Sequence, residues 1–266
     1  MSFAQTKKVL LEDFSGAHCS QCPMGAYYTD SMLAKYPDLI AVSLHSYTSY
    51  DSMHFAQIDT IYNAYSMGAP MGAVDRINSG TVSSDVAKYI TQWDPAIQTQ
   101  LAVTPEVSLT ISPTWNSSTR NISALINIDI LSNLSNGDYR LSMYVVEDSV
   151  TGTGSGYDQQ NIYNSTPGNP YFGMGDPIVG FIHRHVARAI LPSSWGLAGL
   201  IPSTPAAGQN FSYTFNYTLP ANIDETQVKL IAFVSKNSSN HASDEILNAE
   251  ETELITGTFV EENFTT

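Results

Sequence analysis

The chain has 266 residues, 42% of them apolar, which is long for one compact domain and suits two. Its 11 basic and 25 acidic residues give a formal net charge of −14, which argues against nucleic acid and anionic membrane surfaces as partners. No apolar run approaches the roughly 20 residues that span a bilayer, so the sequence predicts no transmembrane segment.

Strand and helix patterns alternate over the first hundred residues. Five segments are predicted in the order strand, helix, strand, helix, strand, at residues 7–14, 25–35, 39–44, 55–65 and 72–77. The polar residues Ser83 to Asp85 then predict the N-cap of a third helix, which carries Val86 and Trp93 and is kinked or split by Pro95. This order predicts an α/β layer over residues 1–103.

The pattern changes near residue 104, after which short strands and turns predominate. Strands are predicted at residues 106–111, 123–131, 139–146, 182–191, 211–219 and 228–234. Most of them alternate apolar and polar residues, as in a half-buried antiparallel sheet, so residues 104–266 are predicted to form an all-β antiparallel sandwich domain. Within it, residues 151–180 hold seven of the 17 glycines and no apolar period, which indicates a functional or mobile loop.

The two cysteines of the chain, Cys19 and Cys22, form a Cys-x-x-Cys pair between a predicted buried strand and a helix. A helix N-terminus stabilises a thiolate, so Cys19 is the candidate nucleophile of a redox site and Cys22 its resolving partner. A static local disulfide is the alternative, because such a pair rests oxidised in an oxidising compartment whether or not it turns over. No further cysteine is present to complete a zinc site.

The run at residues 9–14, followed by the cysteine pair, resembles the active-site strand and motif of thioredoxin. The resemblance implies that Asp13, six residues before Cys19, accepts a proton from the resolving cysteine; a strand-edge acid in water is the alternative. It also implies a cis peptide bond before Pro70, facing the disulfide. The chain departs from thioredoxin in having His18, and not tryptophan, before the first cysteine.

Most of the chain also resembles the outer-membrane-protein-twenty-eight-related family of Bacteroidetes. The segments that carry the resemblance are residues 11–16, the cysteine pair with Pro23, residues 68–72, Asp75-Arg76 and residues 182–189. The resemblance implies a thioredoxin-like domain fused to a β-sandwich, and export to the periplasm, the outer-membrane surface or the extracellular space. It implies no established reaction.

Two pairs of histidines have two interpretations each. His183 and His185 lie two residues apart on a predicted strand, where they either bind Zn²⁺ or Cu²⁺ with a further ligand or bond to the preceding glycine-rich loop. His45 and His54 flank a tyrosine-rich loop that either lines a ligand pocket or is an ordinary polar loop. The sequence assigns no metal site and no cofactor.

Two kinds of triplet match glycosylation signals. Eight Asn-x-Ser/Thr triplets occur, which a bacterial chain normally leaves unmodified. Four Asp-Ser/Thr-apolar triplets resemble an O-glycosylation sequon of exported Bacteroidetes proteins. Two of these four lie in predicted loops, so Ser52 and Ser149 are the candidate modification sites.

Two functions follow from these observations. In the favoured one, the chain is a surface binding or assembly protein whose partner is another protein or a second copy of itself, and the cysteine pair is a redox-capable disulfide in a scaffold. In the alternative, it is a thiol–disulfide oxidoreductase in which Cys19 attacks, Cys22 resolves, Asp13 relays a proton and Pro70 shapes the substrate-pairing backbone. A thioredoxin-like fold does not guarantee thioredoxin chemistry, so whether the chain is an enzyme stays open.

Overall fold

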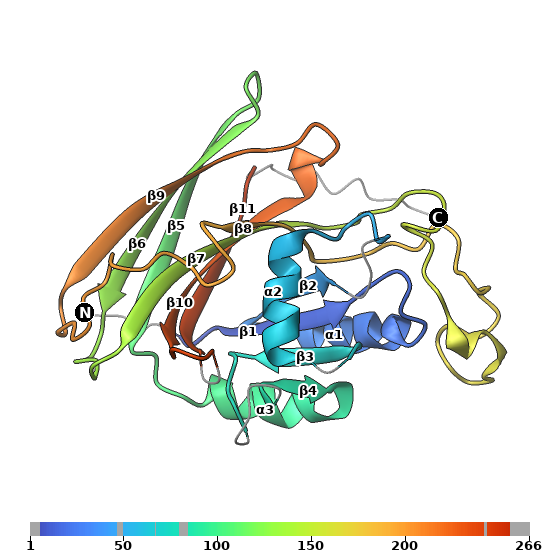
Figure 1. Cartoon of the computed structure of the whole chain (residues 1–266), viewed down its shortest axis with the longest axis horizontal. Helices are drawn as coiled ribbons and strands as arrows, with labels where there is room; N and C mark the ends of the chain where they lie inside the picture. The colour runs from blue at the N-terminus through green and yellow to red at the C-terminus, as the bar shows by residue number, and fades with distance from the viewer. Residues whose placement is uncertain (1–5, 47–49, 67, 80–84, 242–243, 256–266) are drawn as a thin grey trace, which may run out of the picture.

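The structure is a computed structural model that describes residues 6–46, 50–66, 68–79, 85–241 and 244–255 (Figure 1). It contains an eight-stranded sheet in the order β11-β10-β7-β8-β2-β1-β3-β4 and a separate three-stranded antiparallel sheet in the order β5-β6-β9. The fold is therefore mixed α/β, with a large sheet and a second, smaller one. Among the described residues, no helix is both long and apolar enough to cross a membrane.

The first half of the large sheet follows the predicted alternation. The elements of this part of the chain are, in order, β1 (Val9–Ser15), α1 (Cys22–Lys35), β2 (Leu39–His45), α2 (Ala56–Tyr65), β3 (Met71–Val74) and β4 (Ala87–Tyr89). β1 and β2 are parallel and buried along their whole length, whereas β3 runs antiparallel to β1 and β4 antiparallel to β3. This burial on both faces explains why the two central strands read as continuous apolar runs.

The predicted third helix is wrong in its first part. Residues 87–89 form the short strand β4, and the helix α3 extends only over Trp93–Leu101 after a 3₁₀ turn. Pairing with β3 overrides the helical spacing of this segment, and Pro95 lies in the first turn of α3, where its missing N–H costs nothing. The predicted cap at residues 83 and 84 lies outside the described residues.

Strands from the second half of the chain divide between the two sheets. The small sheet holds β5 (Val107–Asn116), β6 (Asn121–Ile130) and β9 (Asn210–Thr218). The large sheet gains β7 (Asp138–Glu147), β8 (Val186–Leu191), β10 (Val228–Asn237) and β11 (Glu245–Glu253). β8 lies beside β2 in parallel, with Ser43 opposite Val186, so the large sheet crosses the boundary predicted near residue 104.

Helices cover both faces of the large sheet where it contains β1 and β2 (Figure 1). Ile58, Ile61 and Tyr65 of α2 pack in one core with Leu10 and Phe14 of β1. On the opposite face, Met32 of α1 and Trp93 and Ile97 of α3 pack against β1 and β2. The strand residues in this core are Val9, Leu11, Leu39 and Ala41. Further along the sheet, side chains of β7, β10 and β11 share a third core with the small sheet.

A buried charged group joins the two halves of the chain. Arg76, 1% exposed, donates from Nε and Nη2 to the two carboxylate oxygens of Glu12, both at 2.7 Å. Its Nη2 also donates to the Tyr144 hydroxyl on β7 at 2.8 Å, and that hydroxyl donates to Glu12. The guanidinium therefore has carboxylate and phenol partners on β1 and β7, which compensates for its removal from water.

Candidate functional site

Cys19 and Cys22 form a disulfide at the start of α1. Their Cα atoms are 5.3 Å apart, and the pair lies at the start of a helix, as the sequence predicts, although α1 begins at Cys22 and not at residue 25. Pro23 occupies the first turn, where a missing N–H is tolerated. Cys19 is 3% exposed and Cys22 is 1% exposed, so both residues of the disulfide are shielded from solvent.

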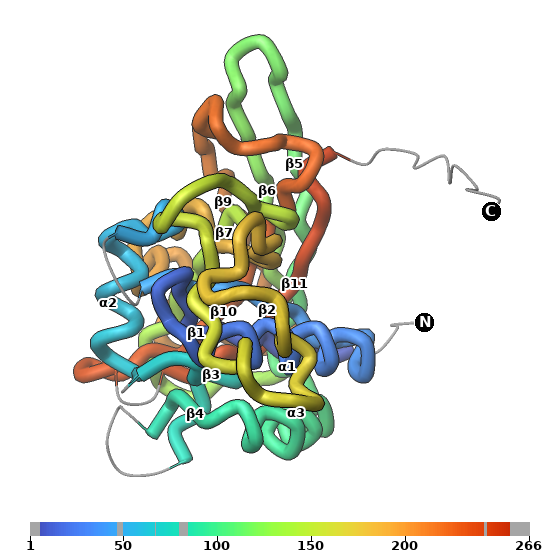
Figure 2. Tube along the Cα trace, turned by 90° about the vertical axis from the view of Figure 1, so that its right-hand side faces the viewer, coloured from blue at the N-terminus to red at the C-terminus, as the bar shows by residue number. Residues whose placement is uncertain are grey.

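The glycine-rich loop, residues 151–180, is bonded to the backbone around the two cysteines and includes a 3₁₀ turn at Ile162–Ser165. The buried Gln159 donates from its amide to the carbonyl oxygens of Gly16, Ala17 and Cys19, at 3.2, 3.2 and 2.8 Å. Two backbone N–H groups of the loop, at residues 160 and 162, also donate to carbonyl oxygens of residues 17 and 20. Figure 2 shows the loop, in yellow, lying over the end of the molecule where α1 begins.

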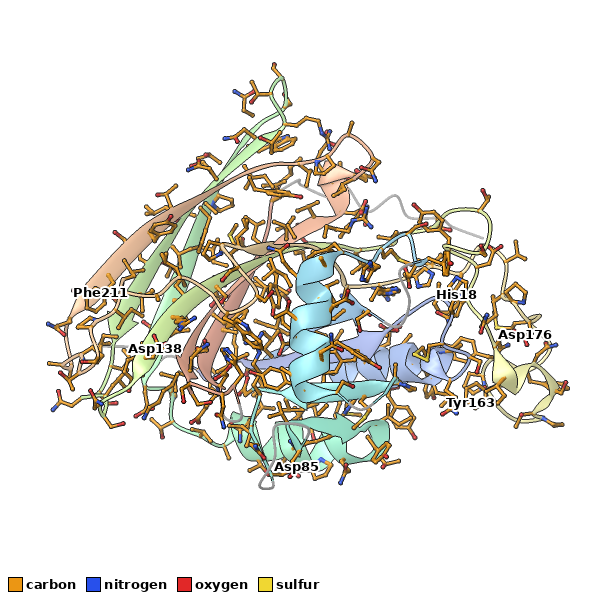
Figure 3. All side chains as sticks on the ribbon, viewed as in Figure 1. His18, Asp85, Asp138, Tyr163, Asp176 and Phe211 are labelled. Carbon is orange, nitrogen blue, oxygen red and sulfur yellow. A yellow bond between two sulfur atoms is a disulfide. The ribbon has the colours of Figure 1, made fainter. Side chains whose placement is uncertain are left out.

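The loop is also held together internally. The buried Asn161 donates from its amide to the carbonyl oxygens of Tyr171 and Gly175, and its backbone N–H donates to the carboxylate of Asp176 at 2.8 Å. The Asn164 side chain accepts from the N–H of Gly175. Figure 3 labels Tyr163 and Asp176 on this loop at the same end of the molecule as His18. The loop is therefore a bonded cover over the cysteine segment.

Asp13 lies on β1 beneath the start of α1. It is 2% exposed, so the interpretation of this residue as a strand-edge acid in water is wrong. Its Oδ1 is buried and has no hydrogen-bond partner among the described residues, and burial raises the pKa of the carboxyl to about 7. A carboxyl with such a pKa can hold or release a proton near neutral pH.

The predicted cis peptide bond between Ala69 and Pro70 is confirmed. Pro70 approaches α1 at Gly25, where a Cβ atom would lie 2.8 Å from the Cβ of Pro70 and 3.5 Å from Oδ1 of Asp13. Glycine is therefore the residue that lets the helix, the proline and the aspartate meet at this distance. The sequence reasoning did not single out Gly25, because a lone glycine near the start of a helix gives no signal of close packing.

A small cavity lined by many polar residues lies beside Cys22. Its walls include Asp13, Cys22, Thr29, His45, His183 and His185. Three of its buried polar atoms have no hydrogen-bond partner in the described part of the chain: Asp13 Oδ1, Thr29 Oγ1 and His185 Nε2. Unpartnered buried polar atoms around one small cavity are the arrangement that bound water satisfies.

The histidines at this cavity have different environments. His45 Nδ1 lies 2.8 Å from Asp51 Oδ2. Burial pushes the pKa of Asp51 upward, but the His45 charge and hydrogen bond and two backbone N–H donors lower it to about 2. Burial, and then the nearby His45, lower the pKa of His183 to about 4, so this ring is neutral at pH 7.

The structure separates the two members of the His-x-His pair. His183 bonds to the carbonyl oxygen of Tyr157 at 2.7 Å, which confirms the predicted contact with the glycine-rich loop for this ring only. His185 has a left-handed backbone (φ 55°) and lies 3.7 Å from Asp30, so the two rings do not project from one regular strand. No group of three or more metal-ligating side chains gathers in the described ranges.

The two candidate glycosylation residues are exposed, Ser52 beside the glycine-rich loop and Ser149 in a turn after β7. The backbone N–H of Ser52 donates to the carbonyl oxygen of Gly156. The carboxylate of the preceding Asp51 is buried and hydrogen-bonded to His45. Ser149 has φ 57°. Both hydroxyls stay candidates for modification.

The fold and the site define a mixed α/β protein with a covered Cys-x-x-Cys disulfide at the start of a helix. A search of curated proteins gives no match. The family model described as "Outer membrane protein Omp28" matches residues 57–254, and the chain belongs to this family. It is an exported protein, as the family resemblance in the sequence implies, located in the periplasm, at the outer-membrane surface or in the extracellular space.

Solved structures with the same overall fold have low sequence identity. HBP35 of Porphyromonas gingivalis is 20% identical, with a TM-score of 0.70 over 98% of this chain and 80% of that one. A protein from Agrobacterium tumefaciens is 12% identical, with a TM-score of 0.55 over 95% of this chain and 97% of that one. At these identities the likeness concerns the fold alone.

Proposed function

We propose that the chain is a surface binding protein of the cell envelope, built on a thioredoxin-like scaffold in which the disulfide is a structural clip beneath a binding loop. Support for the scaffold comes from the strand order β2-β1-β3-β4, with β1 and β2 parallel and the other two antiparallel. The cysteine pair at the start of α1 and Pro70 before β3 fit the same scheme.

The second half of the proposed architecture is a β-sandwich over residues 104–266. Its support is the core shared by the small sheet and by β7, β10 and β11 of the large sheet, which includes Ile126, Phe215, Leu230 and Leu247. Residues 1–103 and 104–266 are then two units of sequence that share one large sheet.

The observation that best supports a structural role for the disulfide is the burial of Cys19 and Cys22. A thiolate exchanges with a disulfide by direct attack on one sulfur, so access to that sulfur controls the rate. With 3% and 1% of the two residues exposed, an external thiol reaches the bond only after residues 159–162 move away. A thioredoxin-like nucleophile needs the opposite arrangement, an accessible first cysteine.

The binding surface is the outer side of the loop. Large apolar side chains between residues 162 and 182 are at least half exposed; they are Ile162, Phe172, Met174, Val179 and Ile182. Apolar groups gathered on one segment of an exported protein are typical of a protein-binding surface. The partner class is therefore a protein with an apolar patch of its own.

The clip is tested by the rate at which dithiothreitol reduces the native disulfide, read by alkylation and mass. Gln159→Ala removes the bonds to three carbonyl oxygens and is expected to accelerate reduction at least tenfold, which corresponds to about 1.4 kcal/mol of easier opening. Gln160→Ala is the matched control, because this exposed side chain has no hydrogen bond to the cysteine segment, and it should leave the rate unchanged. Equal rates in all three proteins would refute the clip.

The binding surface is tested by capture from an envelope extract. A double variant, Phe172→Ser with Val179→Ser, should lose a partner that the native chain retains. Val103→Ser changes an exposed apolar residue after α3 and is the control that keeps the partner. Retention of every partner by the double variant would contradict a binding role for the loop.

A thiol–disulfide oxidoreductase is the second candidate, and buried Asp13 in the cavity beside Cys22 favours it. The Cys19 thiolate attacks a substrate disulfide and releases one substrate thiolate. Cys22, deprotonated by Asp13, then attacks Cys19, which releases the second substrate thiol and reforms the internal disulfide. The two electrons come from the internal dithiol, which an external thiol reductant must restore. Catalysis of insulin reduction by the native chain, lost in Cys19→Ser, would establish this candidate.

A further inference from the structure

The described strands leave four edges at the borders of the two sheets. They are β4 and β11 in the large sheet, and β5 and β9 in the small one. A bare edge presents unpaired N–H and C=O groups to other chains, so natural proteins block it with short strands, charges, prolines, bulges or a cover. The four edges differ in these protections.

Three of the edges are protected. β4 has only three residues. β11 has four glutamates, at positions 245, 250, 251 and 253, and its pairing with β10 contains a bulge. β5 contains Pro113, and Asn248 of β11 donates to the carbonyl oxygen of Val107 at its start.

Among the described residues, the strand β9 is not short and has no charge, proline or bulge, and no described strand covers its outer edge. Its nine residues, Asn-Phe-Ser-Tyr-Thr-Phe-Asn-Tyr-Thr, include no proline and no charged side chain. Its pairing with β6 has no register shift, and no described strand pairs with its other side. Tyr213 is 37% exposed, and five of its eight neighbours in the strand are also exposed. Aromatic and threonine residues are those that favour strand pairing.

We propose that β9 is the contact through which two copies of this chain associate, by antiparallel pairing about a two-fold axis at Thr214. A two-fold contact pairs each residue with one whose number is as far from 214 on the other side. Tyr213 then faces Phe215 and Phe211 faces Tyr217, so aromatic residues meet aromatic residues. On the opposite face Ser212 meets Asn216, and the two Thr214 residues meet each other. The strand is self-complementary in this register.

Charge favours this edge over others. Each copy has a formal net charge of −14, so two copies repel each other over most of their surfaces. β9 is uncharged along its whole length, whereas β11 would bring glutamates against glutamates. Added salt screens the general repulsion and should strengthen the association.

The β9 edge is distant from the binding loop. Figure 3 labels Phe211 of β9 at one end of the molecule and His18, beside the loop, at the other. The inference adds self-association to the proposed binding role, and the loop variants test that role separately. If the β9 test fails, the proposed binding surface on the loop is unaffected. If the loop variants keep every partner, the proposed β9 contact is unaffected.

The test is sedimentation of the full chain over a concentration series to about 1 mM, at low and at moderate salt. A nine-residue edge is smaller than a standard protein interface, so we expect a weak dimer whose mass-average rises with concentration and with salt. Thr214→Lys places two ammonium groups opposite each other at the axis and should hold the protein at the monomer mass. Thr114→Lys is the matched control: it adds the same exposed charge on β5, at the other edge of the sheet, and should dimerise like the native chain.

Three results with the native chain and the two lysine variants would overturn the proposal. They are a native chain that stays monomeric throughout the series, a dimer unaffected by Thr214→Lys, and a dimer lost equally in both lysine variants. The unfolding midpoint of each variant shows whether it is folded. A chain truncated after residue 255 tests whether another segment occupies the β9 edge. The proposal expects this chain to dimerise like the native one. Loss of the dimer would instead assign the β9 edge to the C-terminal segment of a second copy.

Discussion

Replacement of Arg76 by methionine tests the buried charge that joins the two halves of the chain. Methionine keeps much of the volume but removes the bonds to Glu12 and to Tyr144. Glu12, which is 0% exposed, is then a buried carboxylate without its cation. Breaking a buried pair on one side costs about 3–5 kcal/mol, and the loss of ring contacts with Tyr65, Trp195 and Phe233 adds to it.

This cost is measurable as a change in the free energy of unfolding, from urea titration followed by circular dichroism. For a chain of this size, a loss of about 3–5 kcal/mol lowers the melting temperature by roughly 6–20 °C. Because Glu12 and Tyr144 lie on strands from opposite halves of one sheet, we expect a single transition in which both halves unfold together.

Two further variants separate the charge from the packing. Glu12→Gln combined with Arg76→Met leaves no unpaired charge, so the double variant should be more stable than the sum of the two single losses predicts, by about 2 kcal/mol or more. Arg184→Met breaks an ion pair with Asp148 in which the arginine side chain is 50% exposed, and should cost at most about 1 kcal/mol. A loss below about 1 kcal/mol in Arg76→Met, or strict additivity in the double variant, would refute the reasoning.

Two other substitutions test the surroundings of the disulfide. Asp13 has a folded-state pKa of about 7 against an ordinary value near 4, so its contribution to stability is present below pH 4 and is lost as pH rises toward 7. Asp13→Asn should therefore stabilise the protein at pH 8 by up to roughly 4 kcal/mol. A slope of unfolding free energy between pH 4 and 8 that is the same in the native chain and the variant would contradict this. Gly25→Ala puts a Cβ atom 2.8 Å from that of Pro70 and should lower the free energy of unfolding in urea by about 1–3 kcal/mol, although alanine favours helices. Gly68→Ala is the control: no atom lies within 4 Å of its added Cβ, so this variant should be nearly neutral.

Local features of the fold could be predicted from the sequence. The buried strands β1 and β2 follow from apolar runs, and the antiparallel strands of the second half follow from alternation, with ends shifted by a few residues. The placing of the cysteine pair at the start of a helix and the cis bond before Pro70 follow from the motif and its resemblance. These features depend on residues close together in the chain.

Long-range partners could not be predicted. Alternation says which face of a strand is buried but not which strand lies beside it, so the pairing of β8 with β2 had no signal. Glu12 and Arg76 are 64 residues apart, and although Glu12 lies in a strand predicted to be buried, nothing near either residue shows that the other is its partner. The amide of Gln159 lies in a glycine-rich loop whose composition suggests mobility, yet it reaches three carbonyl oxygens near Cys19.

The central claim is that the disulfide is a covered clip, and the kinetic order of its reduction tests this claim most directly. The rate of reduction of the native chain is measured over a wide range of dithiothreitol concentration. If the loop must open first, the rate rises with thiol at low concentration and then reaches a plateau at the opening rate. A rate that stays proportional to thiol concentration throughout, at the speed of an exposed disulfide, would contradict the clip and favour an oxidoreductase.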